Sequence, residues 1–259
     1  MAVDVQLFWA FLVAFVRASA LCLQAPVFGS RLTPAPVRIG LSAVLAAGLA
    51  PLIKSSVGAP PAEWILLMMR LVAEALIGLV MGYGVSLIIG AAAMAGELLD
   101  MKMGFGLMQL LNPVSSFPTS LLAQFHYLLA MTLFALVDGH HLLLMALARS
   151  FEASGGIEGL VPLAEHGMHT MTWLASEMMV LCLQIAAPAG GVLLVVDAAM
   201  AAVSRAVPQV PVWLIGMPAK IAIGFIALGA SLPALVSLSL RLTDLSARFL
   251  GEWLKMLGL

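Results

Sequence analysis

The sequence predicts an all-α integral membrane protein, because it is too apolar for a soluble domain and its apolar stretches have the length of membrane-spanning helices. Of the 259 residues, 63% are hydrophobic and 10% are charged, against about 25% charged residues in an ordinary soluble domain. A soluble domain of this length must still cover itself with polar surface. The apolar stretches show no strand-like alternation. We therefore expect about six long, bent apolar helices followed by an amphipathic C-terminal helix.

The predicted spans follow from length. A hydrocarbon core of about 30 Å needs about 20 apolar residues in a helix. Six segments approach or exceed that length, at residues 5–28, 37–57, 64–96, 121–148, 171–196 and 212–240. The first segment is predicted to be a membrane span of the mature protein. It is preceded by Asp4 and lacks the positively charged N-terminal region of a signal peptide. Basic residues are nearly even on the two sides of such a topology, so they do not set an orientation.

Composition also excludes several classes of function. A net charge of −1 without a basic cluster argues against nucleic-acid binding. Two cysteines, Cys22 and Cys182, cannot form a disulfide scaffold. No catalytic triad or paired-carboxylate arrangement is supported by its context. We expect no enzymatic activity, no cofactor and no resident metal.

Charged residues inside the apolar segments are the first candidate functional residues. A charge within a membrane span is costly and usually faces a cavity or a protein partner, although charges near segment ends can instead snorkel to the interface. Arg70 and Glu74 stand one helical turn apart and can pair. Lys220 needs an acceptor, which Asp197, Glu177 or a partner carboxylate can supply. The full set comprises Arg17, Arg70, Glu74, Asp138, Glu177 and Lys220.

Two motifs resemble known sites but lack the surrounding sequence. Gly82-Tyr83-Gly84 is similar to a potassium filter, yet it lies inside an unbroken apolar run without a re-entrant loop. These glycines are better explained by helix packing. The cluster at residues 138–141, Asp-Gly-His-His, could bind a metal with His126 as a further ligand. Histidines at a helix–loop junction more often bond to backbone, so we do not predict a metal site.

The stretch at residues 103–120, MGFGLMQLLNPVSSFPTS, combines apolar side chains with glycine, proline and serine. Irregular backbone of this kind cannot face lipid, because each unpaired polar group would cost several kcal/mol. It must be buried in protein or line a cavity. An apolar loop at membrane depth suits an element that closes a conduit; the alternative is an interfacial loop without a special role.

The last two segments predict a bent hairpin and an amphipathic tail. Prolines and glycines interrupt the hairpin, among them Pro188, Gly190, Gly191 and Pro208, and small residues such as Gly224 permit close helix contact. In the tail, apolar residues recur every three or four positions, at Leu242, Leu245, Phe249, Trp253 and Leu257. The tail is expected to lie on a membrane surface or to pack on a partner helix.

Together these features resemble the FliR family of flagellar export proteins, whose relatives in injectisomes are the SctT proteins. The resemblance covers nearly the whole chain. It rests on Arg17 before Pro26 and Phe28, on the apolar loop GFGLMQLLNPVSS, on Asp138-Gly139-His140-His141 with Ser150-Phe151, and on Asp197 with residues 205–209 (Arg-Ala-Val-Pro-Gln), Pro218 and Lys220.

The resemblance implies a non-enzymatic subunit of the type III export gate in the bacterial inner membrane, within the flagellar basal body. Its partners would be FliP and FliQ, with FlhB and FlhA, and its substrates unfolded flagellar proteins. It implies a FliP-like part (1–170), a FliQ-like hairpin (171–240) that docks against FliQ with Gly224 at the contact, and the tail (241–259). The pore plug would comprise Gly104, Phe105, Gly106, Leu107, Met108, Gln109, Leu110, Asn112, Pro113, Ser115 and Ser116. The competing hypothesis is an autonomous multi-span transporter.

Overall fold

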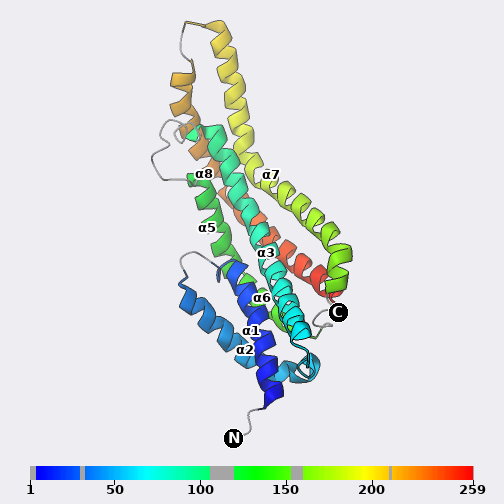
Figure 1. The fold of residues 1–259 in the computed structure, drawn as a ribbon. Helices are drawn as coiled ribbons and strands as arrows, with labels where there is room; N and C mark the ends of the chain where they lie inside the picture. The colour runs from blue at the N-terminus through cyan, green and yellow to red at the C-terminus, as the bar shows by residue number, and fades with distance from the viewer. Residues whose placement is uncertain (1–3, 30–32, 106–119, 153–159, 210–211, 259) are drawn as a thin grey trace. The chain divides into compact units, whose positions relative to one another are not determined.

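The computed structural model describes residues 4–29, 33–105, 120–152, 160–209 and 212–258. Within these ranges the chain is built from α-helices and contains no β-strand (Figure 1). The helices are α1 (Val5–Gln24), α2 (Ala35–Val57), α3 (Trp64–Met103), α5 (Leu121–Leu136), α6 (Gly139–Arg149), α7 (Leu160–Ala206) and α8 (Val212–Met256). The predicted all-α fold is confirmed.

Most of these helices have the dimensions of membrane spans. Among the described residues, α1, α2, α3, α7 and α8 each contain a stretch long and apolar enough to cross a membrane. Helices α5 and α6 together make a sixth if the bent pair is counted as one span. By length and composition, these are the six segments that the sequence predicts.

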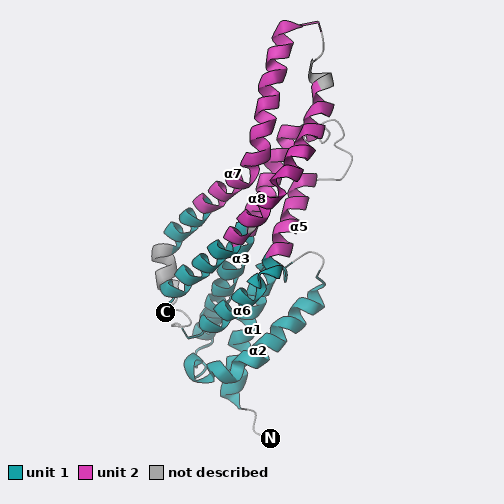
Figure 2. Cartoon of the chain, turned by 180° about the vertical axis from the view of Figure 1, so that it is seen from behind, with its two compact units in different colours: residues 1–88, 134–175, 243–259 teal, residues 89–133, 176–242 magenta. Residues whose placement is uncertain are grey.

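The helices group into two compact units (Figure 2). Unit 1 comprises residues 1–88, 134–175 and 243–259, and unit 2 comprises residues 89–133 and 176–242. Helices α3, α7 and α8 each contribute one part to each unit. The predicted division at residues 170 and 240 into FliP-like, FliQ-like and tail parts concerns likeness to other proteins, and it stays a prediction.

Local sequence explains where the first three helices begin or end. The Asp4 carboxylate accepts hydrogen bonds from the backbone N–H groups of Gln6 and Leu7, at 3.2 and 3.3 Å, and so caps the start of α1. Helix α2 has a proline in its first turn, where the missing N–H needs no partner. Helix α3 ends at Gly104, whose φ of +91° lies in the left-handed region that favours glycine.

The fourth predicted segment is two helices rather than one. Helices α5 and α6 meet at an angle of 65°, and Asp138 lies at the break with a left-handed φ of 57°. Aspartate tolerates this conformation, and Gly139 follows it where a Cβ would overlap the Phe134 ring. Asp138 is exposed and caps no N–H group with its side chain. Asp138 therefore lies at a helix break and not within a continuous helix, and the expectation that it faces protein in an assembly stays a prediction.

The last two helices are longer than predicted. Helix α7 begins at Leu160, before the predicted start at residue 171, and α8 runs to Met256 without a break at residue 241. The tail is thus the end of α8 and not a separate helix. Its apolar side is buried by the chain itself, because Leu242, Leu245, Phe249, Trp253 and Leu257 are each at most 7% exposed. The expectation that this side lies on a membrane surface is wrong.

Glycines bring the helices of unit 1 into close contact. A Cβ at Gly82 would lie 2.7 Å from the carbonyl oxygen of Leu21, and one at Gly78 would overlap the carbonyl oxygen of Arg17. These two glycines of α3 are one turn apart, so they let the α1 backbone approach, as small residues do in membrane helices. Gly84 lies under the Phe249 ring of α8. The prediction that Gly82 and Gly84 serve helix packing is confirmed.

Replacing Gly78 tests this packing. Gly78→Ala should lower the free energy of unfolding, because the clash with the Arg17 carbonyl costs about 1–3 kcal/mol, more than the roughly 1 kcal/mol that alanine gains over glycine in a helix. The matched control is Gly90→Ala in the same helix, since nothing lies within 4 Å of a Cβ at Gly90. Thermal unfolding of the purified chain measures both, and equal stability of the two variants would contradict close packing at Gly78.

Candidate functional site

The structure describes the two ends of the predicted plug loop. Gly104 and Phe105 are described, whereas Gly106, Leu107, Met108, Gln109, Leu110, Asn112, Pro113, Ser115 and Ser116 lie outside the described residues. Contacts around the two ends define a candidate site in unit 2. We call it the loop base, and it consists of Asp100, Met103, Gly104, Phe105, Ser120 and Leu122.

Asp100 ties the two ends of the loop together. This carboxylate, in the last turn of α3, is 4% exposed. It accepts a hydrogen bond from the Ser120 hydroxyl and another from the backbone N–H of Leu122, at 3.3 Å. Ser120 Oγ in turn accepts from the N–H of Ala123 at 3.0 Å and caps α5. A negative charge at the start of a helix is also favoured by the helix dipole.

A glycine makes this contact sterically possible. A Cβ at Gly96 would overlap the Leu122 carbonyl group and would lie 2.6 Å from the Cα of Ala123. Gly96 and Asp100 are one turn apart on α3, so the missing side chain and the carboxylate face the same helix start. One hint of this arrangement is visible in the sequence, because serine at residue 120 is a good N-cap ahead of an apolar run. It did not reveal Asp100 as the partner.

The end of α3 also packs on α8. Met103 is 1% exposed, and a Cβ at Gly224 would lie 2.7 Å from its Cε and 2.8 Å from its Sδ. The Phe105 ring meets the Phe225 ring edge-on, with centroids 6.2 Å apart. Gly224 is therefore occupied by a side chain of the same chain. The prediction that Gly224 contacts FliQ is wrong, because a small residue permits close approach without specifying which helix approaches.

His126 lies one turn after Leu122 and is 0% exposed. Its Nδ1 is 2.8 Å from the Leu122 carbonyl oxygen, so Nδ1 carries the hydrogen and donates it. The histidine therefore bonds to backbone. His126 does not join Asp138, His140 and His141 in a cluster, and no group of three or more His, Cys, Asp or Glu in the described part of the chain could hold a metal.

The acceptor of Lys220 is Asp197. The two side chains form an ion pair between α8 and α7 in unit 2, and they are 23% and 33% exposed. Of the three acceptors considered from the sequence, the structure thus selects the one on the preceding helix. Glu177 is half-buried and forms no ion pair with any described residue.

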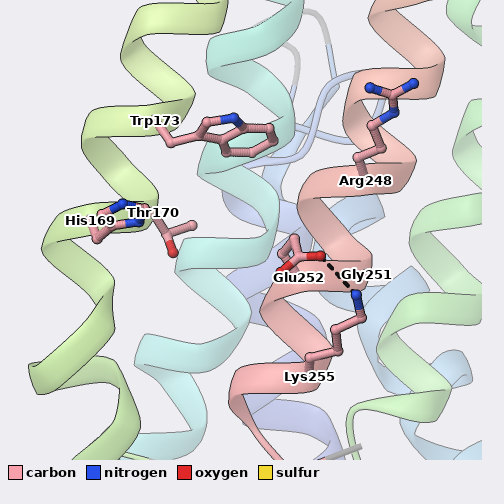
Figure 3. Close-up of a pocket in the computed structure, with 7 residues that line it drawn as sticks. All are labelled: His169, Thr170, Trp173, Arg248, Gly251, Glu252 and Lys255. Atoms are coloured by element: carbon pink, nitrogen blue, oxygen red, sulfur yellow. Dashed lines mark hydrogen bonds and ion pairs between the residues drawn. The ribbon is translucent and has the colours of Figure 1, made fainter.

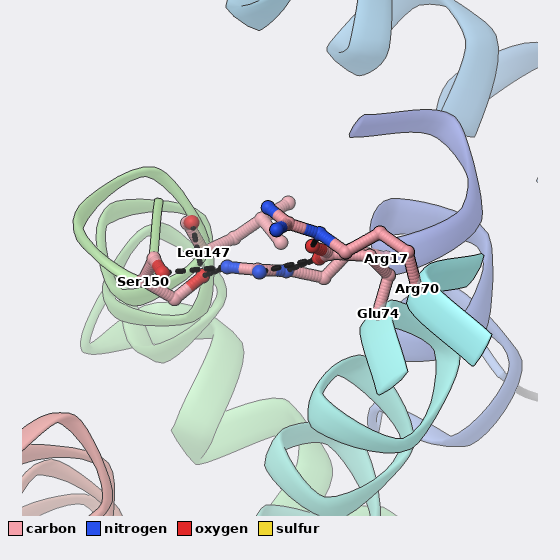
Figure 4. Close-up of polar contacts among 5 residues, drawn as sticks. All are labelled: Arg17, Arg70, Glu74, Leu147 and Ser150. Carbon is pink, nitrogen blue, oxygen red and sulfur yellow. Dashed lines mark hydrogen bonds and ion pairs between the residues drawn. The ribbon is translucent and has the colours of Figure 1, made fainter. Parts of the chain in front are cut away.

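The most buried charges meet in unit 1 (Figure 4). Arg17 of α1 and Glu74 of α3 are both 0% exposed. Arg17 Nε donates to Glu74 Oε2 at 2.6 Å, and Nη1 donates to the carbonyl oxygen and the Oγ of Ser150, at 2.6 and 2.8 Å. Figure 4 shows the guanidinium between Glu74 and Ser150. The Phe151 ring covers it, with its centroid 4.0 Å from Cζ. We call these residues, with Arg70, the Arg17 cluster.

Arg70 adds a second cation to this cluster. Its Nε donates to Glu74 Oε1 at 3.0 Å, and its side chain is 20% exposed. The pair that the i, i+4 spacing predicts is present. Two guanidinium groups share one carboxylate, so the Ser150 carbonyl and the Phe151 ring face must supply the remaining negative potential. Burial of an ion pair is tolerated only when its other polar atoms are bonded in this way.

The predicted packing residues of α7, α8 and the turn between them differ in exposure. Pro188, Gly191 and Pro208 are exposed, and nothing lies within 4 Å of a Cβ at Gly191. Gly190 is half-buried, and a Cβ there would lie 3.8 Å from a Leu99 methyl group. Gly191 therefore remains accessible to another molecule, whereas Gly224 does not.

Comparison with known proteins decides the family. Residues 8–245 match the family described as bacterial export proteins, family 1. The flagellar biosynthetic protein FliR of Bacillus subtilis (strain 168) is 33% identical over 230 residues, which are 86% of each chain. This chain belongs to the FliR family of bacterial export proteins. Its FliR relatives in Pectobacterium carotovorum and Escherichia coli K12 are 29% and 27% identical, over 88% and 87% of this chain and 84% of each relative.

The FliR family match covers both candidate sites. Residues 8–245 include the Arg17 cluster and the loop base, together with the Lys220–Asp197 pair. The part of α8 that follows residue 245 lies beyond the match, although Phe249 and Trp253 belong to the buried part of unit 1. The resemblance on which the sequence prediction rested is confirmed.

Single substitutions in the Arg17 cluster should destabilise this FliR family member strongly. Glu74→Leu leaves two guanidinium groups without a counter-charge, and Arg17→Leu leaves Glu74 with Arg70 alone. Breaking a buried pair typically costs about 3–5 kcal/mol. The double variant Arg17→Leu/Glu74→Leu should recover part of this loss, because it removes both buried charges. Thermal unfolding and the yield of monodisperse protein measure the effect.

The matched control is the exposed pair of Asp4 and Lys54, whose side chains are 48% and 37% exposed. Lys54→Leu should leave yield and unfolding temperature unchanged, since exposed ion pairs contribute little. A double variant that is no more stable than the worse single variant would show that Arg17 and Glu74 do not depend on each other.

Proposed function

We propose that this FliR family member is a non-enzymatic subunit of the flagellar type III protein export gate in the bacterial inner membrane, within the basal body. With FliP and FliQ it forms the channel through which unfolded flagellar subunits are exported, and FlhB and FlhA join that assembly. The names of its relatives and of its family support a role in flagellar export. The long apolar helices support the membrane location.

The contacts of the loop base support the proposal that residues 106–119 close the channel. A closing element must be apolar, must stay at one place in the channel and must give way without unfolding a helix. Asp100 holds the end of α3 and the start of α5 together, and these are the two points at which residues 106–119 join the described chain. Met103 and Phe105 fix the first end on α8. In this proposal the segment moves aside while the contacts of the loop base persist.

Shortening the segment tests the closing role. Deletion of residues 106–110 should leave the gate assembled with FliP and FliQ but make the membrane leak small solutes, because the shortened loop no longer fills the channel. Asp100→Ala should also cause a leak, since it releases the start of α5 from α3. The matched control is Glu97→Ala, which removes an exposed acid three residues earlier in the same helix and should keep the membrane tight.

The outcomes separate the gate from the alternatives. An assembled gate that stays impermeable after the deletion would remove the closing role. If the wild-type chain does not co-purify with FliP and FliQ, yet alone transports a solute into liposomes, the chain is an autonomous multi-span transporter.

We further propose that the α7–α8 region of unit 2 docks against FliQ at the exposed side of α7 around Gly191. Val192, Leu194 and Val195 beside this glycine are 42–70% exposed, so the surface is apolar and accessible. Small residues let a partner helix approach closely, and close packing drives association in membranes.

Gly191→Leu should reduce the amount of FliQ in the purified complex severalfold, because it adds bulk at the contact without adding polarity. Gly48→Leu on α2 is the control, since a Cβ there also meets nothing within 4 Å. Retention of FliQ by Gly191→Leu at the level of Gly48→Leu would count against docking on this side of α7.

A further inference from the structure

The ring of His126 in α5 is buried with one of its two nitrogens unbonded. His126 is 0% exposed, and its Nδ1 donates to the carbonyl oxygen of Leu122 at 2.8 Å. In that tautomer Nε2 carries no hydrogen and can only accept. Nε2 has no hydrogen-bond partner within the described residues. Since buried polar atoms in proteins are nearly always bonded, the bare Nε2 indicates a role beyond packing.

The cavity of about 510 Å³ between α7 and α8 in unit 1 shows the opposite situation (Figure 3). Its Lys255 donates to the Glu252 carboxylate at 2.8 Å, and the Thr170 hydroxyl donates to Sδ of Met256 at 3.5 Å. Arg248 is exposed. Among the described side chains that line this cavity, no polar atom is both buried and unbonded.

His126 is joined to the loop base through Leu122. The Leu122 carbonyl group that accepts from Nδ1 is also the group that a Cβ at Gly96 would overlap. The N–H of the same residue donates to Asp100 at 3.3 Å. Leu122 is therefore bonded to α3 through its N–H and to His126 through its carbonyl oxygen.

Asp100 of α3 is the charged group that acts on the ring. Its carboxylate lies close enough to His126 for its negative charge to be felt there. Its oxygens already accept from Ser120 and Leu122, and no hydrogen bond joins them to Nε2. Asp100 thus favours a positive charge on the ring without offering it a bonded partner.

The other titratable groups of unit 2 leave the ring unaffected. Glu97 and Lys102 of α3 are exposed, and neither they nor the described charges of α7 and α8 act on His126. Helix α5 contains no Asp, Glu, Lys or Arg, and its other titratable residue is Tyr127. The protonation of His126 therefore depends on its burial, its bond to Leu122 and Asp100.

We propose that His126 is a positioning residue that makes the loop base sensitive to pH. The ring is neutral while α3 holds the start of α5, and its protonation releases that start. Where the inference concerns the channel, it rests on the proposed function, in which the loop base holds the segment that closes the gate.

The sign of the effect follows from the unbonded nitrogen. A second hydrogen on Nε2 would create a buried cation whose new N–H has no acceptor, which is costly. This cost disappears when the ring reaches water, so protons favour the arrangement in which α5 separates from α3. An exposed imidazole takes up its second proton at about pH 6.5. The contact is thus stable above this pH and weakens as the pH falls below it.

Hydrogen exchange of the purified full-length chain tests the inference. The measured quantity is amide exchange in residues 120–126, corrected for the effect of pH on the chemical exchange rate. Lowering the pH from 7.5 to 5.5 should increase opening of this segment about tenfold, as expected for one proton that binds the open arrangement alone. His126→Gln, which keeps a neutral amide at every pH, should abolish the increase.

The matched control is His141→Gln, because His141 is exposed and lies in unit 1. This variant should respond to acid as the wild type does. A wild-type segment that does not open in acid, or the same opening in His126→Gln, would overturn the inference. A second measurement requires no substitution: the NMR signals of labelled histidine rings at pH 7.5 should show a hydrogen on Nδ1 of His126 and none on Nε2. A doubly protonated ring at that pH would also overturn it.

The gate assembled with FliP and FliQ separates this inference from the closing role. If both hold, the membrane leaks small solutes at pH 5.5, and His126→Gln reduces the leak. If residues 120–126 open in acid but the membrane stays tight, the role of His126 stands and the closing role of residues 106–119 fails. A leak in acid that persists unchanged in His126→Gln would assign the pH dependence to another group and refute the role of His126.

Discussion

Unit 1 depends on one constraint, which is that the guanidinium of Arg17 must find all its partners inside protein. Three helices satisfy it, because α1 supplies the arginine, α3 the carboxylate and the end of α6 the Ser150 oxygens. Glu74, Gly78 and Gly82 recur every fourth residue and so face α1 along one side of α3. The two glycines bring the backbones close enough for Glu74 to reach Arg17. The ion pair thus depends on the close contact between α1 and α3. Without that contact the buried guanidinium would stay unpaired, which would cost several kcal/mol.

The loop base in unit 2 uses the same combination of glycine and acid for another purpose. Gly96 admits the start of α5, and Asp100 on the next turn receives its N–H and hydroxyl groups. In unit 1 the carboxylate neutralises arginines, whereas here it caps a helix. Both arrangements satisfy polar groups inside an apolar protein by contacts between segments distant in sequence. This explains why a chain with so few charges places several of them in buried positions.

Periodicity and composition predicted the helices, the spans and the Arg70–Glu74 pair, since these follow from neighbours within one or two turns. They did not predict that Arg17 binds Glu74 and Ser150, because these two residues lie 57 and 133 positions from Arg17 along the chain. The same limit explains the error at Gly224, whose small size is visible in the sequence while its neighbour Met103 is not. At residues 138 and 139 the Asp-Gly pair is typical of a turn, but the apolar residues on both sides favour one continuous helix, which the structure does not have. For the end of α8, the sequence shows which side is apolar, but it does not show that Phe249 on this side packs on Gly84 of α3.

The Phe249 ring over Gly84 has a consequence for biosynthesis. Unit 1 combines α1 and α2 with Phe249 and Trp253, which are 0% and 1% exposed. More than 150 residues separate Gly84 from Phe249 along the chain, so this contact can form only after nearly all of the chain has been translated. Domains built from continuous sequence can fold while synthesis proceeds. Unit 1 can be completed only after α8 has been made, and until then the α3 surface around Gly84 stays uncovered. The helices made first therefore need the membrane, its insertion machinery or another protein to shield them until α8 arrives.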